Sequence, residues 1–161
     1  MPAVPFHSRS PDETRGIGEA LGRALRRLGG SGAVVALWGP LGAGKTCFVQ
    51  GLARGLQVSG YVRSPTFILI HEYRGPTPLY HVDLYRLTSA DLTGLGLEEI
   101  LDGQGVVAIE WPDQALSVLP AERLDIRLTA GESEEERLVE FLPRGERYRK
   151  IAEEVACACS P

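Results

Sequence analysis

The sequence lacks several features that would each define a class of protein. Its three cysteines are an odd number that cannot all pair in disulfides, and no apolar run is long enough to span a bilayer. Acidic residues outnumber basic ones by 21 to 17, and the resulting net charge of −4 does not suggest binding of nucleic acid by the protein's own field. Residues 1–10 show no signal-peptide pattern. We therefore expect a cytoplasmic protein without membrane contact.

The composition is that of an ordinary globular protein. Of the 161 residues, 43% are hydrophobic and 24% are charged, which suits one domain with one sizeable core. We find no internal repeat and no linker long enough to divide the chain, so we expect a single domain over residues 1–161. Asparagine is absent, and only Lys45 and Lys150 are lysines.

Hydrophobic periodicity and turn residues predict helices mixed with strands. A capping box at residues 10–13 begins a helix that ends at Gly29 and Gly30. Further helical segments are expected over 45–56, 89–101 and 145–157, and strands over 33–38, 67–73, 79–84, 106–109, 123–128 and 138–142. The short link at residues 75–78 requires an antiparallel hairpin, because parallel strands need a long crossover. The acidic, glycine-containing segment 130–136 predicts a second, solvated hairpin loop.

The strongest motif lies between a predicted buried strand and a predicted helix. Residues 39–46, GPLGAGKT, match the phosphate-loop pattern G-x-x-x-x-G-K-[ST] in full. Glycines let the backbone N–H groups turn toward phosphates, Lys45 reaches the β- and γ-phosphates, and the Thr46 hydroxyl coordinates Mg²⁺. The residues expected at the nucleotide are Gly42, Ala43, Gly44, Lys45, Thr46 and Cys47. The absence of asparagine excludes the Asn-Lys-x-Asp guanine motif, so we expect ATP.

Two acidic residues end predicted strands and complete the expected site. Glu110 follows the buried run 106–109, and Asp83 lies at the end of the apolar strand 79–84. Either carboxylate could bind Mg²⁺ directly or through water, and either could orient the nucleophile. We therefore expect Lys45, Asp83 and Glu110 as catalytic residues and Thr46, Asp83 and Glu110 as metal ligands. His81 lies on the same strand face as Asp83, either approaching the site or packing as an ordinary strand residue.

Six segments together resemble the TsaE family of bacterial ATPases, formerly called YjeE. The shared segments are GAGKT at 42–46, GLARGL at 51–56, SPTF at 64–67, HVDLYRL at 81–87, LGLEE at 95–99 and IEWP at 109–112. They occur in the family's order. The phosphate loop is common to many families, but SPTF followed by H-x-D-L-Y-R is specific.

The resemblance implies a three-layer α/β P-loop NTPase fold with a mixed parallel and antiparallel sheet. It also implies a role in making threonylcarbamoyladenosine in tRNA, next to the anticodon, together with a TsaD–TsaB pair. In this family ATP hydrolysis supports repeated cycles, and TsaD performs the transfer, so tRNA is contacted only indirectly. By resemblance, Thr66 lies in a switch-like loop near the γ-phosphate, and Trp111 lies close to the nucleotide.

Two departures from the family pattern are small. Pro40 stands where an acidic residue is usual, and Cys47 stands where threonine is common. Two other functions stay open from the residues alone. A small-molecule kinase would need an arginine-bearing lid, and the one lid candidate, residues 89–105, contains no arginine. A nucleotide-gated binding module would use slow hydrolysis only to time an interaction.

Overall fold

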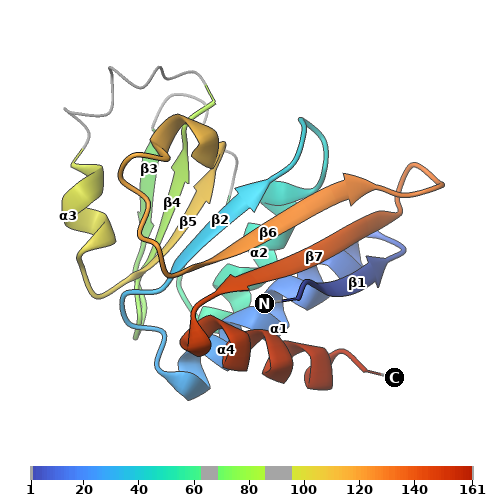
Figure 1. The fold of residues 1–161 in the computed structure, drawn as a ribbon, viewed down its shortest axis with the longest axis horizontal. Coiled ribbons are helices and arrows are strands. Elements are labelled where there is room, and N and C mark those ends of the chain that lie inside the picture. The colour runs from blue at the N-terminus through green and yellow to red at the C-terminus, as the bar shows by residue number, and fades with distance from the viewer. Residues whose placement is uncertain (1, 63–68, 86–95, 161) are drawn as a thin grey trace.

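Strands and helices alternate along most of the chain, as the computed structural model shows for residues 2–62, 69–85 and 96–160 (Figure 1). The elements are β1 (Val4–Ser8), α1 (Pro11–Leu28), β2 (Val34–Trp38), α2 (Lys45–Leu56), β3 (Ile70–Tyr73), β4 (Leu79–Asp83), α3 (Leu97–Leu101), β5 (Val106–Glu110), the 3₁₀ turn η2 (Pro112–Ala115), β6 (Arg123–Ala130), β7 (Arg137–Arg144) and α4 (Glu146–Ala158).

The strands form one mixed sheet in the order β1-β7-β6-β2-β5-β4-β3. The four inner strands β6, β2, β5 and β4 are parallel, whereas β3, β7 and β1 join antiparallel at the two sides. The mixed sheet and both predicted hairpins are confirmed. Parts of two predicted segments, 67–73 and 89–101, lie outside the described residues.

Helices lie on both faces of the sheet and give it three layers (Figure 1). The larger core packs α1, α2 and α4 against side chains such as Val35 and Leu37 of β2. On the other face α3 and η2 cover a smaller core that includes Val34 and Val107. Because β2 is buried on both faces, its sequence is a continuous apolar run. None of the described helices is both long and apolar enough to cross a membrane.

The sequence patterns did not predict strand β1 at the edge of the sheet. Val4 and Phe6 face the larger core, and the Phe6 ring lies 4.8 Å from that of Phe141 in β7. Pro5 makes this short segment a poor strand candidate, because proline lacks the backbone N–H group that pairing between strands uses. An edge strand tolerates it, since one side of the strand has no neighbour.

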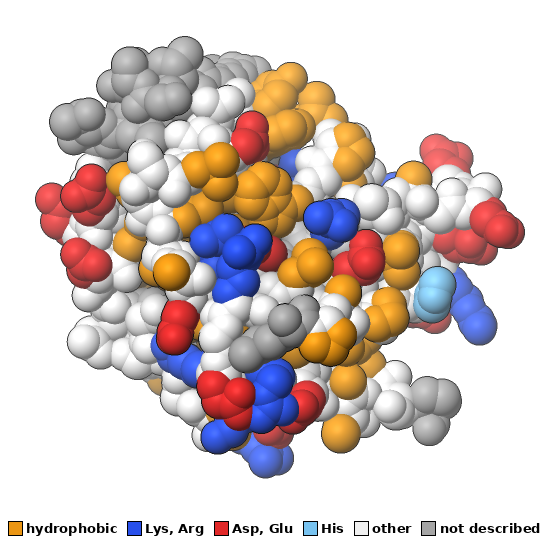
Figure 2. All heavy atoms as spheres, in the orientation of Figure 1, with side chains coloured by type: hydrophobic (Ala, Val, Ile, Leu, Met, Phe, Trp, Pro, Cys, Tyr) orange, Lys and Arg blue, Asp and Glu red, His pale blue; other side chains and the backbone are white. Residues whose placement is uncertain are grey.

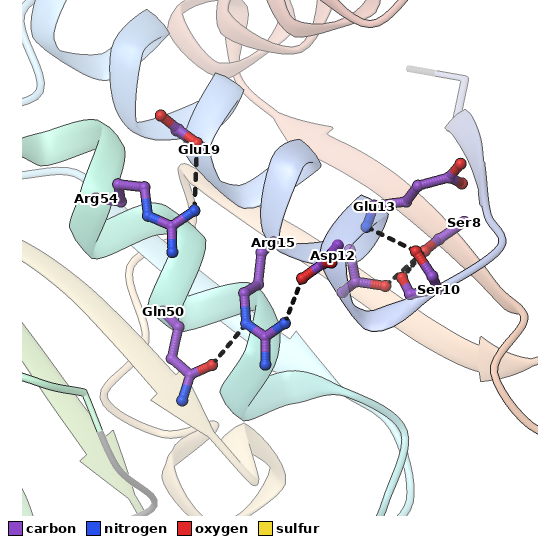
Figure 3. A network of polar contacts seen from close by, with 9 residues as sticks. Ser8, Ser10, Asp12, Glu13, Arg15, Glu19, Gln50 and Arg54 are labelled. Atoms are coloured by element: carbon purple, nitrogen blue, oxygen red, sulfur yellow. Dashed lines mark hydrogen bonds and ion pairs between the residues drawn. The ribbon is translucent and has the colours of Figure 1, made fainter.

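Helix α1 begins at the predicted capping box (Figure 3). The Ser10 hydroxyl accepts a hydrogen bond from the Glu13 backbone N–H at 3.1 Å. The Glu13 carboxylate accepts one from the backbone N–H of Arg9, one residue before the position that the capping-box pattern expects. At the other end Gly29 terminates the helix in a left-handed conformation, with a φ of 81°. Both ends of α1 are therefore capped by neighbouring residues.

Helices α1 and α2 pack unusually closely, because glycines on each helix meet the backbone of the other. A Cβ atom on Gly51 would lie 1.9 Å from the carbonyl oxygen of Arg15, and one on Gly18 would lie 2.2 Å from that of Phe48. Polar side chains also connect the two helices (Figure 3), where the Arg15 Nε atom donates to the Gln50 Oε1 atom at 2.9 Å. The contact fixes α2 firmly in place, and α2 begins at the phosphate-loop lysine.

We expect Gly51→Ala to destabilise the protein by about 1–3 kcal/mol or more, because the added methyl group forces the two helices apart. Gly16→Ala is the matched control, since no atom beyond the adjacent residues and backbone of its own helix lies within 4 Å of its would-be Cβ atom. That control should stabilise α1 by up to about 1 kcal/mol, as alanine favours helix. Urea unfolding measures both changes, and equal stabilities for the two variants would contradict the close packing.

Candidate functional site

The loop between β2 and α2 has the geometry of an anion site. Gly42 and Gly44 have φ values of 77° and 97°, which side chains disfavour and which turn successive backbone N–H groups inward. Among the described residues, no side chain caps the N-terminus of α2, and its first turn contains no acidic residue. By contrast, α1 carries Asp12 and Glu13 in its first turn. The start of α2 therefore keeps its free N–H groups and its positive dipole end for a ligand.

Lys45 is the first residue of α2, and its side chain is only 5% exposed. Its Nζ atom donates to the carbonyl oxygen of Gly39 at 2.6 Å and lies 3.8 Å from the centre of the Trp111 ring. Burial lowers the pKa of Lys45, while the charges of Glu110 and Asp83 oppose that shift. The described contacts of the ammonium group are thus with a carbonyl oxygen and an aromatic ring, and an anionic ligand could replace both.

The two predicted acids end adjacent parallel strands, where Asp83 of β4 is in register with Glu110 of β5. Glu110 is 4% exposed, and its Oε2 atom lies 2.5 Å from the Nε2 atom of the fully buried His81. A carboxylate only accepts, so Nε2 carries the proton and donates it. His81 is thus a packed strand residue that also orients Glu110, so both interpretations of this histidine hold in part.

Asp83 has a more local partner than Glu110. Its Oδ1 atom accepts a hydrogen bond from the Tyr85 backbone N–H at 3.0 Å, so it also caps the turn that follows β4. Burial raises the pKa of Asp83 above its ordinary value, and the nearby Glu110 charge raises it further, although the Tyr85 N–H, His81 and Lys45 oppose the shift. The two carboxylates thus lie side by side at the carboxyl edge of the sheet, where α/β folds bind ligands.

Trp111 covers the buried lysine from the end of β5. Its backbone has a φ of 58°, a conformation that is rare for a bulky residue and that aims the ring across the site. The ring packs against Tyr85, with the ring centres 4.9 Å apart, and against the Lys45 ammonium group. The resemblance placed Trp111 near the nucleotide, and the structure puts it against the phosphate-loop lysine.

A cleft of about 540 Å³ opens over the loop. Its described lining comprises Gly42, Gly44, Lys45, Thr46, Cys47, Glu110, Pro11, Glu134, Glu135 and Arg137. Five predicted loop residues and Glu110 are therefore brought together. Ala43 lies buried in the loop behind them, and Thr66 lies outside the described residues.

Four lining residues were not predicted from the sequence. Pro11 begins α1, and Arg137, Glu134 and Glu135 belong to the β6–β7 hairpin, whose acidic loop we expected to be merely solvated. No motif connects these positions to the phosphate loop, because about 90 residues separate the hairpin from it. Only the pairing of β6 with both β2 and β7 brings the hairpin there.

The oxygen atoms available fit a magnesium ion that arrives with phosphates. The described residues contain no group of three or more His, Cys, Asp or Glu that could hold a metal. Mg²⁺ does not require one, because it is usually bound by one or two carboxylates together with phosphate oxygens and water. Thr46 at the start of α2 and Glu110 at the end of β5 both line the cleft, and Asp83, which is not in its described lining, lies beside Glu110 at the end of β4.

Comparisons with known proteins agree with this geometry. The family model described as "Threonylcarbamoyl adenosine biosynthesis protein TsaE" matches residues 8–139. The tRNA threonylcarbamoyladenosine biosynthesis protein TsaE of Bacillus subtilis is 38% identical over 157 residues, covering 97% of this chain and 96% of that protein. The protein of the same name from Treponema pallidum is 45% identical over 122 residues, covering 75% and 87%. The crystal structure of YdiB from Bacillus subtilis superposes with a TM-score of 0.81 at 34% identity, covering 99% and 97%.

The raised pKa of Asp83 predicts a stability that depends on pH. A native carboxyl group with a raised pKa binds its proton more readily than the unfolded chain does, so ionisation costs stability above that pKa. Asp83→Asn should therefore be more stable than the wild type at pH 7 by about 0.5–2 kcal/mol. The difference should disappear as the pH falls below the ordinary value of 3.8, where both states are protonated.

Urea unfolding without nucleotide or Mg²⁺ at several pH values measures this difference. Asp102→Asn, at an exposed position after α3, is the matched control and should change stability little at any pH. A wild type more stable than Asp83→Asn at pH 7 would contradict the electrostatic account of the site.

Proposed function

The chain belongs to the TsaE family of threonylcarbamoyl adenosine biosynthesis proteins, and from this premise we propose that it is a Mg²⁺-dependent ATPase of tRNA modification. It acts in the synthesis of threonylcarbamoyladenosine next to the anticodon, in the cytoplasm, with a TsaD–TsaB pair. Its ATP hydrolysis supports repeated cycles and does not perform the transfer to tRNA.

One observation carries the ATPase proposal. The uncapped start of α2, the buried Lys45 and the buried Glu110 all line one cleft. A merely structural glycine turn has no need of a buried cation and an oriented carboxylate on the same cavity. Burial of charged groups costs free energy, and protein sites retain it where a ligand or a reaction uses the charges.

Each residue then has a distinct role. The backbone N–H groups of residues 44–47 and the Lys45 ammonium group bind the phosphates, so Lys45 exchanges its contacts with the Gly39 carbonyl oxygen and the Trp111 ring for phosphate oxygens. Thr46 and one or both carboxylates would hold the metal ion, which would supply positive charge against the phosphate oxygens. Glu110, oriented by His81, positions the attacking water, and Asp83 lies beside it.

The surface charge supports indirect contact with tRNA. On the face shown in Figure 2, basic and acidic side chains are interspersed instead of forming a continuous basic tract. The tip of the β6–β7 hairpin, on the right of that view, is acidic and contains Glu132, Glu134 and Glu135. An acidic protein that acts through a partner complex does not need its own phosphate-binding surface for RNA.

Glu110→Gln tests the assignment of the carboxylate. It keeps the size of the side chain and the phosphate loop intact, so Mg²⁺-ATP binding should stay within about threefold of the wild type. Turnover should fall by about 10²–10⁴-fold, the range expected for loss of a group that directs proton transfer. Glu72→Gln, on an exposed position of β3, is the matched control and should keep full activity.

The measurement is Mg²⁺-dependent phosphate release from ATP, with and without purified TsaD–TsaB. Slow release that rises when the pair is added supports the proposal. Full turnover by Glu110→Gln would overturn the role of that residue. Phosphate that accumulates on a small acceptor, with no response to the pair, would identify a kinase instead.

A further inference from the structure

Arg137 joins two segments that both line the cleft. Its Nε atom donates to the carbonyl oxygen of Ala43 at 3.1 Å, and its Nη2 atom donates to that of Gly42 at 3.0 Å. Its Nη1 atom donates to the carbonyl oxygens of Glu134 at 2.6 Å and Glu136 at 2.7 Å. One guanidinium group thus connects the tip of the phosphate loop to the loop of the β6–β7 hairpin.

The fold places this side chain directly beside the phosphate loop. Arg137 is the first residue of β7 and shares a strand face with Val139 and Phe141, which belong to the larger core. Beyond that core the side chain reaches the loop. A Cβ atom on Gly44 would lie 4.0 Å from the Arg137 Nε atom. The position is therefore set by the strand and by core packing, and not by the hairpin loop alone.

The direction of these hydrogen bonds matters for anion binding. A loop that turns its N–H groups toward a phosphate turns its carbonyl groups the other way. At Gly42 and Ala43 these outward carbonyl oxygens meet a permanently charged, planar donor. Charge-assisted hydrogen bonds to such a donor are stronger than those to water or to neutral groups. The Ala43 N–H group itself donates to the carbonyl oxygen of Pro40 at 3.2 Å, so Arg137 fixes the peptide units that lead into Gly44 and the uncapped start of α2, where the N–H groups for the ligand lie.

We propose that Arg137 is the positioning residue of the phosphate loop, which keeps that loop ready for a nucleotide di- or triphosphate and ties it to the β6–β7 hairpin. The inference rests on the proposed ATP binding. It requires no contact between Arg137 and the phosphates. Its four carbonyl partners take four of the five guanidinium N–H donors, all of them on the backbone of the two loops.

Lysine cannot replace arginine in this role. An ammonium group is a compact charge with three donors, whereas the guanidinium group presents five donors in a fixed plane that can serve several carbonyl groups at once. Arg137→Lys keeps the charge but loses the connection between the two loops. It therefore separates the geometric role from a purely electrostatic one.

The experiment compares Arg137→Ala and Arg137→Lys with Arg127→Ala, a control at an exposed position on β6. The dissociation constants of Mg²⁺-ATP and Mg²⁺-ADP are measured by calorimetry, and turnover is measured at saturating ATP. We expect both Arg137 variants to bind ATP and ADP about tenfold more weakly, with turnover at saturation within about twofold of the wild type. Arg127→Ala should match the wild type throughout.

A second readout does not depend on nucleotide binding. Amide hydrogen exchange of Ala43 and Phe48, whose N–H groups donate to the carbonyl oxygens of Pro40 and Gly44, should be at least severalfold faster in Arg137→Ala, while exchange in the α1 and β5 backbone stays unchanged. Unchanged exchange in the loop would overturn the role of Arg137, whether or not the wild type binds ATP. A wild type that binds no ATP would instead contradict the proposed function. Weaker binding of ATP but not ADP, or a large fall in turnover at saturation, would also overturn it, because either indicates direct contact with the transferred phosphate.

Discussion

The buried ammonium group of Lys45 is the constraint on which the arrangement of the site depends. A cation that is 5% exposed needs compensating partners, and here they are the Gly39 carbonyl oxygen, the Trp111 ring and two nearby carboxylates. These partners come from three parts of the fold, because Glu110 and Trp111 are adjacent at the end of β5. The central strand β2 leads into the loop, β4 and β5 end in the acids, and the close α1–α2 contact holds the helix that begins at the lysine.

The same arrangement brings charged groups together at an electrostatic cost. Two carboxylates end adjacent strands, and burial raises the pKa of Asp83 while it lowers that of Lys45. Phosphates would compensate the positive charge of Lys45, and a divalent cation would compensate the negative charges of the two carboxylates. His81 and Arg137 act around this centre without belonging to the motif, one on the carboxylate of Glu110 and the other on the loop carbonyl groups.

Much of the fold and the centre of the site could be predicted from the sequence, because their signals are local. The buried strand 33–38, the phosphate loop and the two hairpins each depend on adjacent residues, and the structure confirms these elements. Strand β1 was missed because Pro5 breaks a short pattern that only an edge position tolerates. Arg137 was missed because its phosphate-loop partners, Gly42 and Ala43, lie more than 90 residues away, and only the strand order brings them together.

The most direct test of this account is calorimetric titration of Mg²⁺-ATP into the wild type, Lys45→Ala and Lys150→Ala. Lys150 is the only other lysine and is exposed on α4, so it is the matched control. We expect Lys150→Ala to bind as the wild type does, and Lys45→Ala to bind roughly 10–100-fold more weakly, as loss of a charged hydrogen-bond donor predicts. Equal binding by all three proteins would contradict the central role of Lys45.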